Sequence, residues 1–349
     1  MNEWAANSNW PLVGHAEASA AVRAAIVQDR IPHAWLITGP EGVGRTTLAL
    51  LIAQALNCER QREQRPCGTC DSCKRIAARN HPDVLVADMA WQHTMVGSGS
   101  GERAKVRQRF SIDAIRWLRG DIVMRPIQGR WKVQILDDAG LFSHDAPDAF
   151  LKVLEEPPPY AVLILVAESV DQAPETIRSR CRHIALGLVS AAEIVSALRH
   201  RGVDAEQATQ LAQIARGRVG WVFDALHQPD LLLQRRVALE TAFEHLTTPL
   251  GRAAITGVIA GSHAKKRDDT YTLLAHWVGM WRDALLLQVG LGDALHYPEL
   301  GARLADWSAR FDVPTIVDAL AATQRCLHDL DTNVQARIAL QAMVTRWPS

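Results

Sequence analysis

The sequence has no excess of positive or negative charge. Lys plus Arg and Asp plus Glu both number 38 among 349 residues, so the formal net charge is zero. Binding to nucleic acid through overall positive charge is therefore not indicated, although a neutral total leaves room for a local basic patch.

Long apolar runs are also missing. No stretch reaches the roughly 18 apolar residues of a membrane-spanning helix. Residues 1–14 lack a basic segment followed by an apolar one, so no secretory signal is evident there. We therefore expect a cytoplasmic location without a membrane partner, in a compartment where disulfides are disfavoured.

Cysteine is scarce and unevenly distributed. There are six, of which two stand alone, Cys181 and Cys326, and four fall within residues 58–73: Cys58, Cys67, Cys70 and Cys73. Four clustered thiolates in a reducing compartment, with no histidine among them, suit tetrahedral Zn²⁺ in a closed structural site. Spacing alone leaves iron–sulfur ligation open, and unrelated reduced cysteines are the other alternative. We predict a structural zinc module without a catalytic role.

A glycine-rich loop at 39–46 follows an apolar run and precedes a helical one. Its defining residues are Gly39, Gly42, Gly44, Arg45 and Thr46. This is the G-x-x-x-x-G-K-[ST] phosphate loop with arginine at the lysine position. Such glycines let backbone amides converge on phosphate, and the Thr hydroxyl binds Mg²⁺. The alternative is a turn whose glycines only allow close packing of strand and helix.

The arginine at the lysine position is the first indication that ATP hydrolysis is impaired. Arg45 keeps the positive charge, but its side chain is longer, planar and forked, so it is a poor substitute in a tight site. We expect an inherited nucleotide fold in which binding of ATP is doubtful and efficient hydrolysis is absent.

Two carboxylates end an apolar run at 131–136. Asp137 stands where a Walker B carboxylate would hold Mg²⁺. The next position often carries a glutamate that activates water, and Asp138 is one methylene shorter. A displacement of about 1 Å can cost on the order of 10²-fold in rate. A solvated strand end that caps the next helix is the alternative.

Strand and helix patterns alternate along the first half of the chain. They predict strands at 33–39, 81–88, 131–140, 161–169 and within 177–186, and helices at 46–59, 111–124 and 145–156. We therefore predict an α/β fold with a mostly parallel, doubly wound sheet. Ser111 is the expected N-cap of its helix, and the Gly, Ser and charged residues at 95–109 predict a loop.

Beyond residue 188 the pattern is helical. Three short amphipathic helices are predicted within 190–228, and longer ones follow from about 230 without a convincing strand. Trp277 and Trp281 have helical spacing, which favours packing over the stacking of bases. One α/β domain, one small helical domain and one helical bundle are expected.

Two motifs near the predicted third and fourth strands are typical of one protein family. They are Leu151-Lys152-x-Leu154-Glu155-Glu156-Pro157-Pro158 and, after the next strand, Ser179-Arg180-Cys181. They resemble the AAA+ clamp-loader family of the bacterial DNA polymerase III, which shares the four-cysteine insertion. The resemblance implies an AAA+ P-loop domain at 1–187, an all-α lid at 188–230 and an all-α collar at 231–349 for oligomerisation.

Four departures from the family pattern indicate a subunit that does not hydrolyse ATP. They are Arg45 for lysine, Asp138 for glutamate, Glu168-Ser169 for a threonine-type sensor, and Gly220 where a second sensor arginine is expected. The nearby Arg218 leaves the last of these open. Together they describe a degenerate nucleotide site.

Arg180 is the residue that the resemblance marks as catalytic. In the family this arginine reaches a neighbour's ATP, and such an arginine finger in trans is worth roughly 10³ to 10⁵ in rate. Without the family pattern, a solvated loop arginine beside Arg178 and Arg182 would be the simpler interpretation. Glu155 and Glu156 are expected to close a helix or to form ion pairs at an interface.

The resemblance also implies partners. These are catalytic gamma or tau subunits and a delta subunit in a heteromeric ring, the sliding clamp, and primer–template DNA through the assembly. One alternative is an active gamma- or tau-type ATPase in which Arg45 and Asp138 still function. The other is a zinc-bearing nucleic-acid-binding module with a vestigial nucleotide fold, against which the neutral net charge argues.

Overall fold

The computed structural model describes seven stretches of the chain: 10–95, 110–137, 151, 153–228, 230–263, 266–332 and 334–348. Residues 96–109 of the predicted loop lie outside them, as do Asp138 and most of the helix predicted at 145–156. Contacts divide the chain into two compact units, Met1–Val222 and Phe223–Ser349, and each is described by itself.

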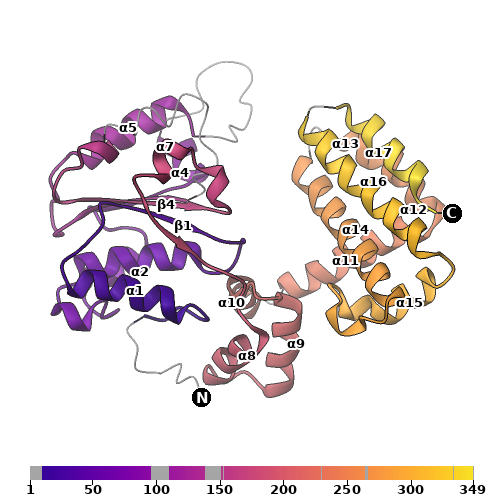
Figure 1. Cartoon of the computed structure of the whole chain (residues 1–349), viewed down its shortest axis with the longest axis horizontal. Helices are drawn as coiled ribbons and strands as arrows, with labels where there is room; N and C mark the ends of the chain where they lie inside the picture. Colours follow the sequence, from indigo (N-terminus) through magenta and orange to yellow (C-terminus); the bar gives the residue numbers. More distant parts are fainter. Residues whose placement is uncertain are drawn as a thin grey trace. The chain divides into compact units, whose positions relative to one another are not determined.

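The first unit is built on a five-stranded sheet (Figure 1). Its strands are β1 (Ala34–Thr38), β2 (Val84–Ala87), β3 (Lys132–Asp137), β4 (Ala161–Ala167) and β5 (Arg182–Ala185). The order is β2-β3-β4-β1-β5, and every neighbouring pair is parallel. The predicted parallel sheet is therefore confirmed. Asp137 pairs with Val166 and Thr38 with Ala167, so the carboxyl ends of β1, β3 and β4 meet at one edge.

Helices cover both faces of this sheet (Figure 1). One face carries α1 (Ala16–Val27) and α2 (Arg45–Asn57), and the other carries α4 (Met89–Met95), α5 (Ile112–Ile122) and α7 (Glu175–Arg178). On β1, Trp35 and Ile37 join the core of the α1 and α2 side, whereas Leu36 joins the core on the opposite side. Because successive strand residues point to opposite faces, both faces are buried and the sheet is doubly wound.

Local signals account for part of this arrangement. The Ser111 hydroxyl accepts a hydrogen bond from the Ala114 amide at 3.2 Å, which confirms it as the N-cap of α5. Three further short elements are η1 (Arg62–Gln64), α3 (Asp71–Ala77) and η3 (Val170–Gln172). The sequence patterns did not predict α1, α3 or α4.

A small helical segment follows the sheet. Its helices are α8 (Ala191–His200), α9 (Ala205–Ala215) and α10 (Val219–His227), which match the three predicted ones. Ser190 caps α8 in a reciprocal box with Glu193, and Asp204 caps α9. The boundary between the two units falls inside α10, so the three-domain division at 187 and 230 stays a prediction.

The second unit is helical, and its described residues contain no strand. Its elements are α11 (Asp230–Thr247), α12 (Pro249–Ala254), the π-helical turn η4 (Ile255–Ile259), α13 (Ala260–Ser262), α14 (Arg267–Gln288), η5 (Gly292–Ala294), η6 (Pro298–Leu300), α15 (Gly301–Ser308), α16 (Val313–Asp331) and α17 (Ala336–Arg346). In the described part of the chain, no helix combines the length and apolar character needed to cross a membrane.

Tryptophans form the centre of this second unit. Trp277 and Trp281 are fully buried, and their rings lie 5.4 and 5.9 Å from that of Trp347. The indole N–H of Trp277 donates to the Ala242 carbonyl at 3.0 Å. Both residues are therefore packing residues, as the sequence predicted, and present no stacking surface to bases.

A histidine is enclosed beside this core. His276 Nδ1 lies 2.9 Å from the Tyr297 hydroxyl. Burial lowers the pKa of His276 to about 4, and the charge of Arg235 acts in the same direction. The folded unit therefore holds this imidazole neutral at pH values where an exposed histidine is protonated.

Lowering the pH from 7 towards 5 should reduce the free energy of unfolding of the second unit. In the unfolded chain His276 takes up a proton near pH 6.5, whereas in the folded chain it stays neutral down to about pH 4. Protons therefore favour the unfolded state between these values. Urea unfolding followed by tryptophan fluorescence should show a smaller loss in His276→Gln. The exposed His328→Gln is the matched control, and an equal loss in both variants would contradict this account.

Candidate nucleotide site and metal centre

The phosphate loop joins the end of β1 to the start of α2. Gly39, Gly42 and Gly44 have φ values of 152°, 77° and 107°, which side-chain-bearing residues rarely adopt. A Cβ at Gly39 would lie 2.2 Å from the Leu186 carbonyl oxygen. Gly44 is the N-cap of α2, so the loop delivers its amides to a helix N-terminus. The backbone therefore keeps the form that cradles phosphate.

Two predicted site residues from distant parts of the chain meet beside this loop. The Thr46 hydroxyl donates to both carboxylate oxygens of Asp137, at 3.1 and 3.0 Å. Thr46 lies in the first turn of α2, and Asp137 is the last residue of β3. A hydroxyl and a carboxylate so placed are the ligands that hold Mg²⁺ in phosphate-loop enzymes. Asp138 lies outside the described residues.

Carbonyl groups of the loop are bound from two sides. His15 Nε2 lies 3.0 Å from the Val43 oxygen, and the Gly220 amide donates to the Gly42 oxygen at 2.6 Å. Burial lowers the pKa of His15, so the neutral ring donates its Nε2 proton to the carbonyl. No local pattern in the sequence marks this role of His15, because the contact spans 28 residues.

Position 220 leaves little room for a side chain. A Cβ at Gly220 would lie 3.1 Å from the Gly42 oxygen, and Arg218 Cβ would lie 3.2 Å from a Cβ at Gly42. The start of α10 therefore rests directly on the phosphate loop, with the base of the Arg218 side chain beside it.

The end of β4 borders the same loop. The Gly39 amide donates to the Glu168 carbonyl at 3.2 Å, and the Glu168 side chain is exposed. The Ser169 hydroxyl accepts a hydrogen bond from the Asp171 amide at 3.1 Å, capping η3. The Glu168 backbone thus borders the loop at the position where the family resemblance expects a threonine-type sensor.

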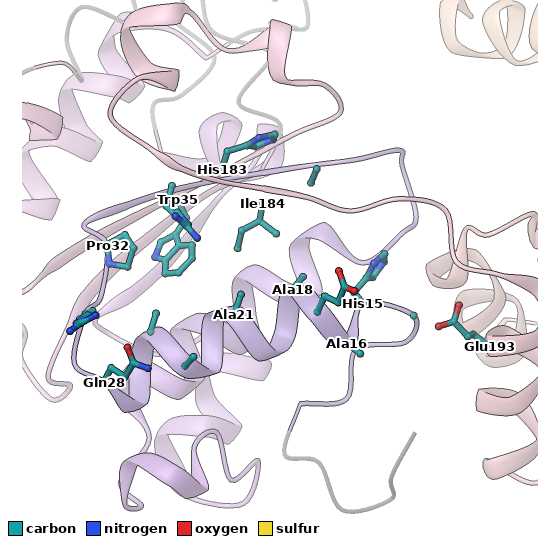
Figure 2. A pocket seen from close by; sticks show the side chains of 17 residues that line it. His15, Ala16, Ala18, Ala21, Gln28, Pro32, Trp35, His183, Ile184 and Glu193 are labelled. Atoms are coloured by element: carbon teal, nitrogen blue, oxygen red, sulfur yellow. The ribbon is translucent and has the colours of Figure 1, made fainter. Parts of the chain in front are cut away.

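A cavity of about 890 Å³ lies between α1 and β5 (Figure 2). Alanines of α1, Trp35 and β5 line it, and His15 and Glu193 stand at one end. Glu193 is engaged by the Ser190 amide and hydroxyl. None of the predicted site residues lines this cavity. Small apolar residues line much of it, beside polar and charged ones such as Arg182 and His183, and it is separate from the predicted nucleotide site.

The four predicted cysteines converge at the far end of α2. Their sulfurs all lie within 4.8 Å of one another, and the Cys58 and Cys70 sulfurs are 4.0 Å apart. A tetrahedron of sulfurs about 2.3 Å from Zn²⁺ places neighbouring sulfurs about 3.8 Å apart. Sulfurs holding an iron–sulfur cluster would be spread over more than one iron and stand farther apart. The cluster can therefore hold a single metal ion.

Hydrogen bonds to sulfur prepare this site for a cation. The Cys70 amide lies 3.3 Å from the Cys67 sulfur, and the Cys73 amide 3.5 Å from the Cys70 sulfur. Burial acts to raise the pKa of Cys67, but hydrogen bonds from Thr69 and the Cys70 amide hold it at about 5. Burial raises the pKa of Cys58 and Cys73. A bound cation would offset the cost of ionising these buried thiols.

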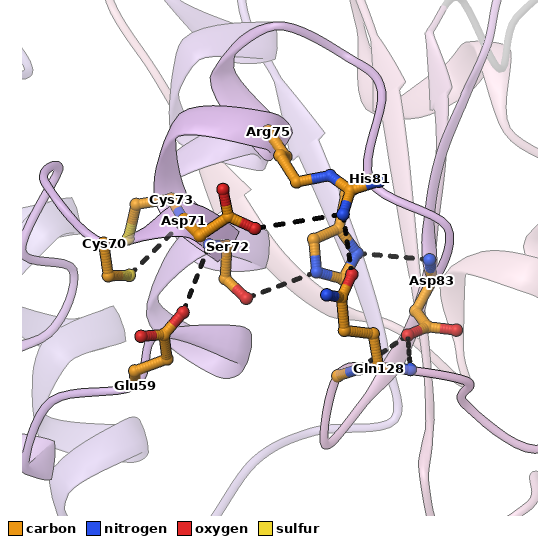
Figure 3. A network of polar contacts seen from close by, with 10 residues as sticks. Glu59, Cys70, Asp71, Ser72, Cys73, Arg75, His81, Asp83 and Gln128 are labelled. Atoms are coloured by element: carbon orange, nitrogen blue, oxygen red, sulfur yellow. Dashed lines mark hydrogen bonds and ion pairs between the residues drawn. The ribbon is translucent and has the colours of Figure 1, made fainter.

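Polar side chains tie the cysteine module to the rest of the first unit (Figure 3). The Gln54 amide donates to the Cys73 carbonyl at 2.8 Å. His81 Nδ1 accepts from the Asp83 amide at 3.1 Å, which leaves the proton on Nε2 to face the Ser72 hydroxyl at 3.3 Å. The module is thereby fixed to α2 and to the start of β2.

A buried carboxylate continues this network. Asp83 accepts hydrogen bonds from three successive amides at 2.6 to 2.7 Å, those of Ile127, Gln128 and Gly129. Burial acts to raise the pKa of Asp83, and these amides outweigh it and lower that pKa. Because α2 has 13 residues, at 1.5 Å per residue about 20 Å separates the phosphate loop from the cysteines. That distance indicates a structural role for the module.

Arg180 lies between α7 and β5, apart from the phosphate loop. Its guanidinium donates to the Glu155 carboxylate at 2.9 Å and to the Thr176 carbonyl at 2.9 Å. Its side chain is 35% exposed. Burial raises the pKa of the adjacent Cys181 to about 12, so this thiol stays protonated. The structure thus groups the predicted residues into a candidate nucleotide site, a candidate metal centre and one separate arginine.

Comparison with known proteins gives consistent similarities. A family model described as DNA polymerase III, delta subunit, matches residues 14–189. The DNA polymerase III subunit gamma of Buchnera aphidicola subsp. Schizaphis graminum is 30% identical over 253 residues, covering 71% of this chain and 65% of that protein. Subunit tau of Escherichia coli K12 is 30% identical over 231 residues, covering 65% of this chain and 33% of that protein.

A solved structure of a gamma subunit-related protein of DNA polymerase III from Thermotoga maritima is also similar. It has 18% identity and a TM-score of 0.42, covering 94% of this chain and 97% of the other. The chain spans less than two thirds of the length of the two curated relatives. The matched residues 14–189 include the phosphate loop, the cysteine module and Arg180.

Replacing one cysteine should empty the metal centre. Cys73→Ser should lose one bound metal ion per chain and lower the stability of the first unit substantially, because metal binding contributes directly to folding. Metal content by mass spectrometry, with thermal unfolding in the presence of a chelator, checks this. Cys326→Ser, which alters a buried cysteine of the second unit, is the control. Equal metal content in both variants would refute the assignment.

Proposed function

The chain belongs to the family described as DNA polymerase III, delta subunit, and we propose that it is a non-hydrolysing subunit of the clamp loader. Within that complex it is of the type called delta-prime. It packs beside a catalytic gamma or tau subunit, donates Arg180 to that subunit's ATP and helps to place the sliding clamp on primed DNA.

The observation that carries this proposal is the state of the phosphate loop. Its glycines and the Thr46–Asp137 pair keep the form of a nucleotide site, while Arg45 occupies the lysine position. A planar guanidinium cannot act as the compact point charge that reaches the β- and γ-phosphates. Glu168, whose backbone carbonyl accepts from the Gly39 amide, brings a negatively charged residue to the edge of the loop in place of a threonine-type sensor. Such a chain keeps the nucleotide-binding fold but does not hydrolyse ATP.

Arg180 is the residue through which the chain would still take part in ATP hydrolysis. Its guanidinium has defined partners in Thr176, Ser179 and Glu155, which favours a held side chain over a loose one. A finger supplied in trans stabilises charge that develops on the transferred phosphoryl group. This chain therefore acts on ATP bound by the neighbouring subunit, and not on ATP at its own phosphate loop.

The cysteine module is assigned Zn²⁺. Four sulfur ligands at tetrahedral spacing suit zinc in a closed site. When bound, the ion supplies charge that keeps the thiolates ionised and cross-links the end of α2 to α3. About 20 Å from the loop, it takes no part in nucleotide chemistry.

The remaining parts of the proposal concern assembly. The second unit, with the predicted collar at 231–349, holds the chain in a ring with gamma or tau and delta subunits. DNA and the clamp are engaged through that ring in the cytoplasm. The helical lid at 188–230 joins the collar to the nucleotide fold.

A second candidate is an active gamma- or tau-type ATPase. Two observations favour it: the curated relatives are gamma and tau subunits, and the Thr46–Asp137 pair is intact. In that case Arg45 would have to serve in place of lysine, and the chain would turn over ATP on its own.

Steady-state hydrolysis separates the two candidates. The isolated chain should show no turnover. In a ring assembled so that only the catalytic site facing this chain is intact, Arg180→Ala should reduce clamp- and DNA-stimulated hydrolysis by on the order of 10³. Arg178→Ala is the matched control, since its side chain pairs with Asp171 at 3.0 Å instead. Robust hydrolysis by the isolated chain, abolished by Asp137→Ala, would establish the active-motor candidate.

A further inference from the structure

One carboxylate of the first unit is placed directly on Arg180. Glu155 Oε1 lies 2.9 Å from a terminal guanidinium nitrogen, Nη2, although 25 residues separate the two along the chain. The other terminal nitrogen, Nη1, donates to the Thr176 carbonyl at 2.9 Å and faces the Ser179 hydroxyl at 3.3 Å. Two separate segments therefore hold the two ends of one guanidinium.

Both segments are anchored in the core. On the Glu155 side, the preceding residues Val153 and Leu154 are 6% and 3% exposed. On the Arg180 side, Ile177 of α7 is fully buried, and the Arg180 amide donates to its carbonyl at 3.1 Å. The relative position of the two side chains is thus set by the packing of the unit and not by the pair itself.

The pair contributes little to folding. Side chains of Arg180 and Glu155 are 35% and 52% exposed, and ion pairs this exposed add little to stability because water and salt screen them. What the contact does restrict is the freedom of a long side chain, since an unconstrained arginine occupies many rotamers. The main effect of the Glu155 contact is therefore to orient the Arg180 guanidinium.

Part of the guanidinium stays available. A guanidinium carries five N–H donors, and the contacts above engage three of them. Among the described residues, the second N–H of Nη2 and the Nε–H have no partner, so they can meet an anion, which binds a guanidinium fork with two parallel hydrogen bonds. Glu155 and Thr176 thus fix the plane of the group without using all of its donors.

We infer that Glu155 is a positioning residue for Arg180. It accepts a hydrogen bond from Nη2 and holds the guanidinium extended for a phosphate presented by a neighbouring subunit. This inference rests on the proposed function of Arg180 in trans. Ordering the finger before the reaction removes an entropic cost from the transition state, so the loss of Glu155 lowers kcat and leaves KM for ATP unchanged.

The test uses rings in which only the catalytic site facing this chain is intact. Glu155→Ala should lower kcat by about three- to tenfold, the range expected for freeing one long side chain. Glu155→Gln keeps an acceptor oxygen and should stay within about twofold of wild type, because the effect depends on the hydrogen bond and not on the charge. Glu156→Ala changes the neighbouring exposed glutamate and should leave kcat unchanged.

A double substitution shows whether Glu155 acts through the finger. Adding Glu155→Ala to Arg180→Ala should cause no further loss, since the partner is already gone. Thermal unfolding and incorporation into the ring should be the same for all variants. Equal kcat for Glu155→Ala and Glu156→Ala would overturn the inference, as would a further loss in the double variant.

Three outcomes separate the inference from the proposed function. A rise in kcat for both Glu155→Ala and Glu155→Gln would mean that the carboxylate masks the charge of the finger, which also overturns the inference. If Arg180→Ala itself leaves hydrolysis unchanged, the proposed function fails and the inference fails with it. If Arg180→Ala is defective and Glu155→Ala is not, only the inference fails.

Discussion

Two polar contacts at opposite ends of α2 and β3 keep these elements in register. At one end, the Asn57 carboxamide accepts hydrogen bonds from the Arg130 and Trp131 amides at 2.9 Å and donates to the Trp131 carbonyl at 3.0 Å. At the other end, Thr46 meets Asp137. Because helix and strand run in opposite directions between these points, the start of the loop helix and the end of the strand are brought together.

Under the proposed function, contacts within the chain explain how a nucleotide site can lose hydrolysis and keep its form. The loop glycines, the cap at Gly44 and the hydrogen bonds to the Gly42 and Val43 carbonyls all arise within the chain. The side chain at the lysine position serves to contact phosphate and is not needed to fold the loop, so the fold tolerates an arginine there. The cysteine module strengthens the same frame at the other end of α2, through Gln54 and Cys73.

How far the sequence predicted the structure depended on the range of the interactions. Apolar runs, the glycine pattern and the Ser111 cap are local signals, and they predicted the strands, the phosphate loop and α5. The alanine-rich α1 lacks a clear apolar stripe, and α3 and α4 have only seven residues each, so no periodicity could reveal them. The cysteine cluster was predictable because its ligands lie within one short segment.

The polar residues that organise the sites were harder to predict. Asn57 acts across 73 and 74 residues, Asp83 across 44 to 46, and Glu155 across 25. Each is an ordinary polar residue in its local sequence and acquires a role only when the sheet brings its partner close. Asp137 was predicted as a site residue only because a known motif describes that long-range pairing.

The contact between Gly220 and the phosphate loop bears on how such a subunit evolves. A Cβ at position 220 would lie 3.1 Å from the Gly42 carbonyl oxygen, so a larger residue there requires a shift of a few tenths of an ångström between α10 and the loop. Changing Arg45 to lysine would leave this contact in place. Under the proposed function, recovery of hydrolysis therefore involves position 45 and the packing of α10 on the loop together. A subunit that depends on both positions is held to its specialised role within a ring of similar subunits.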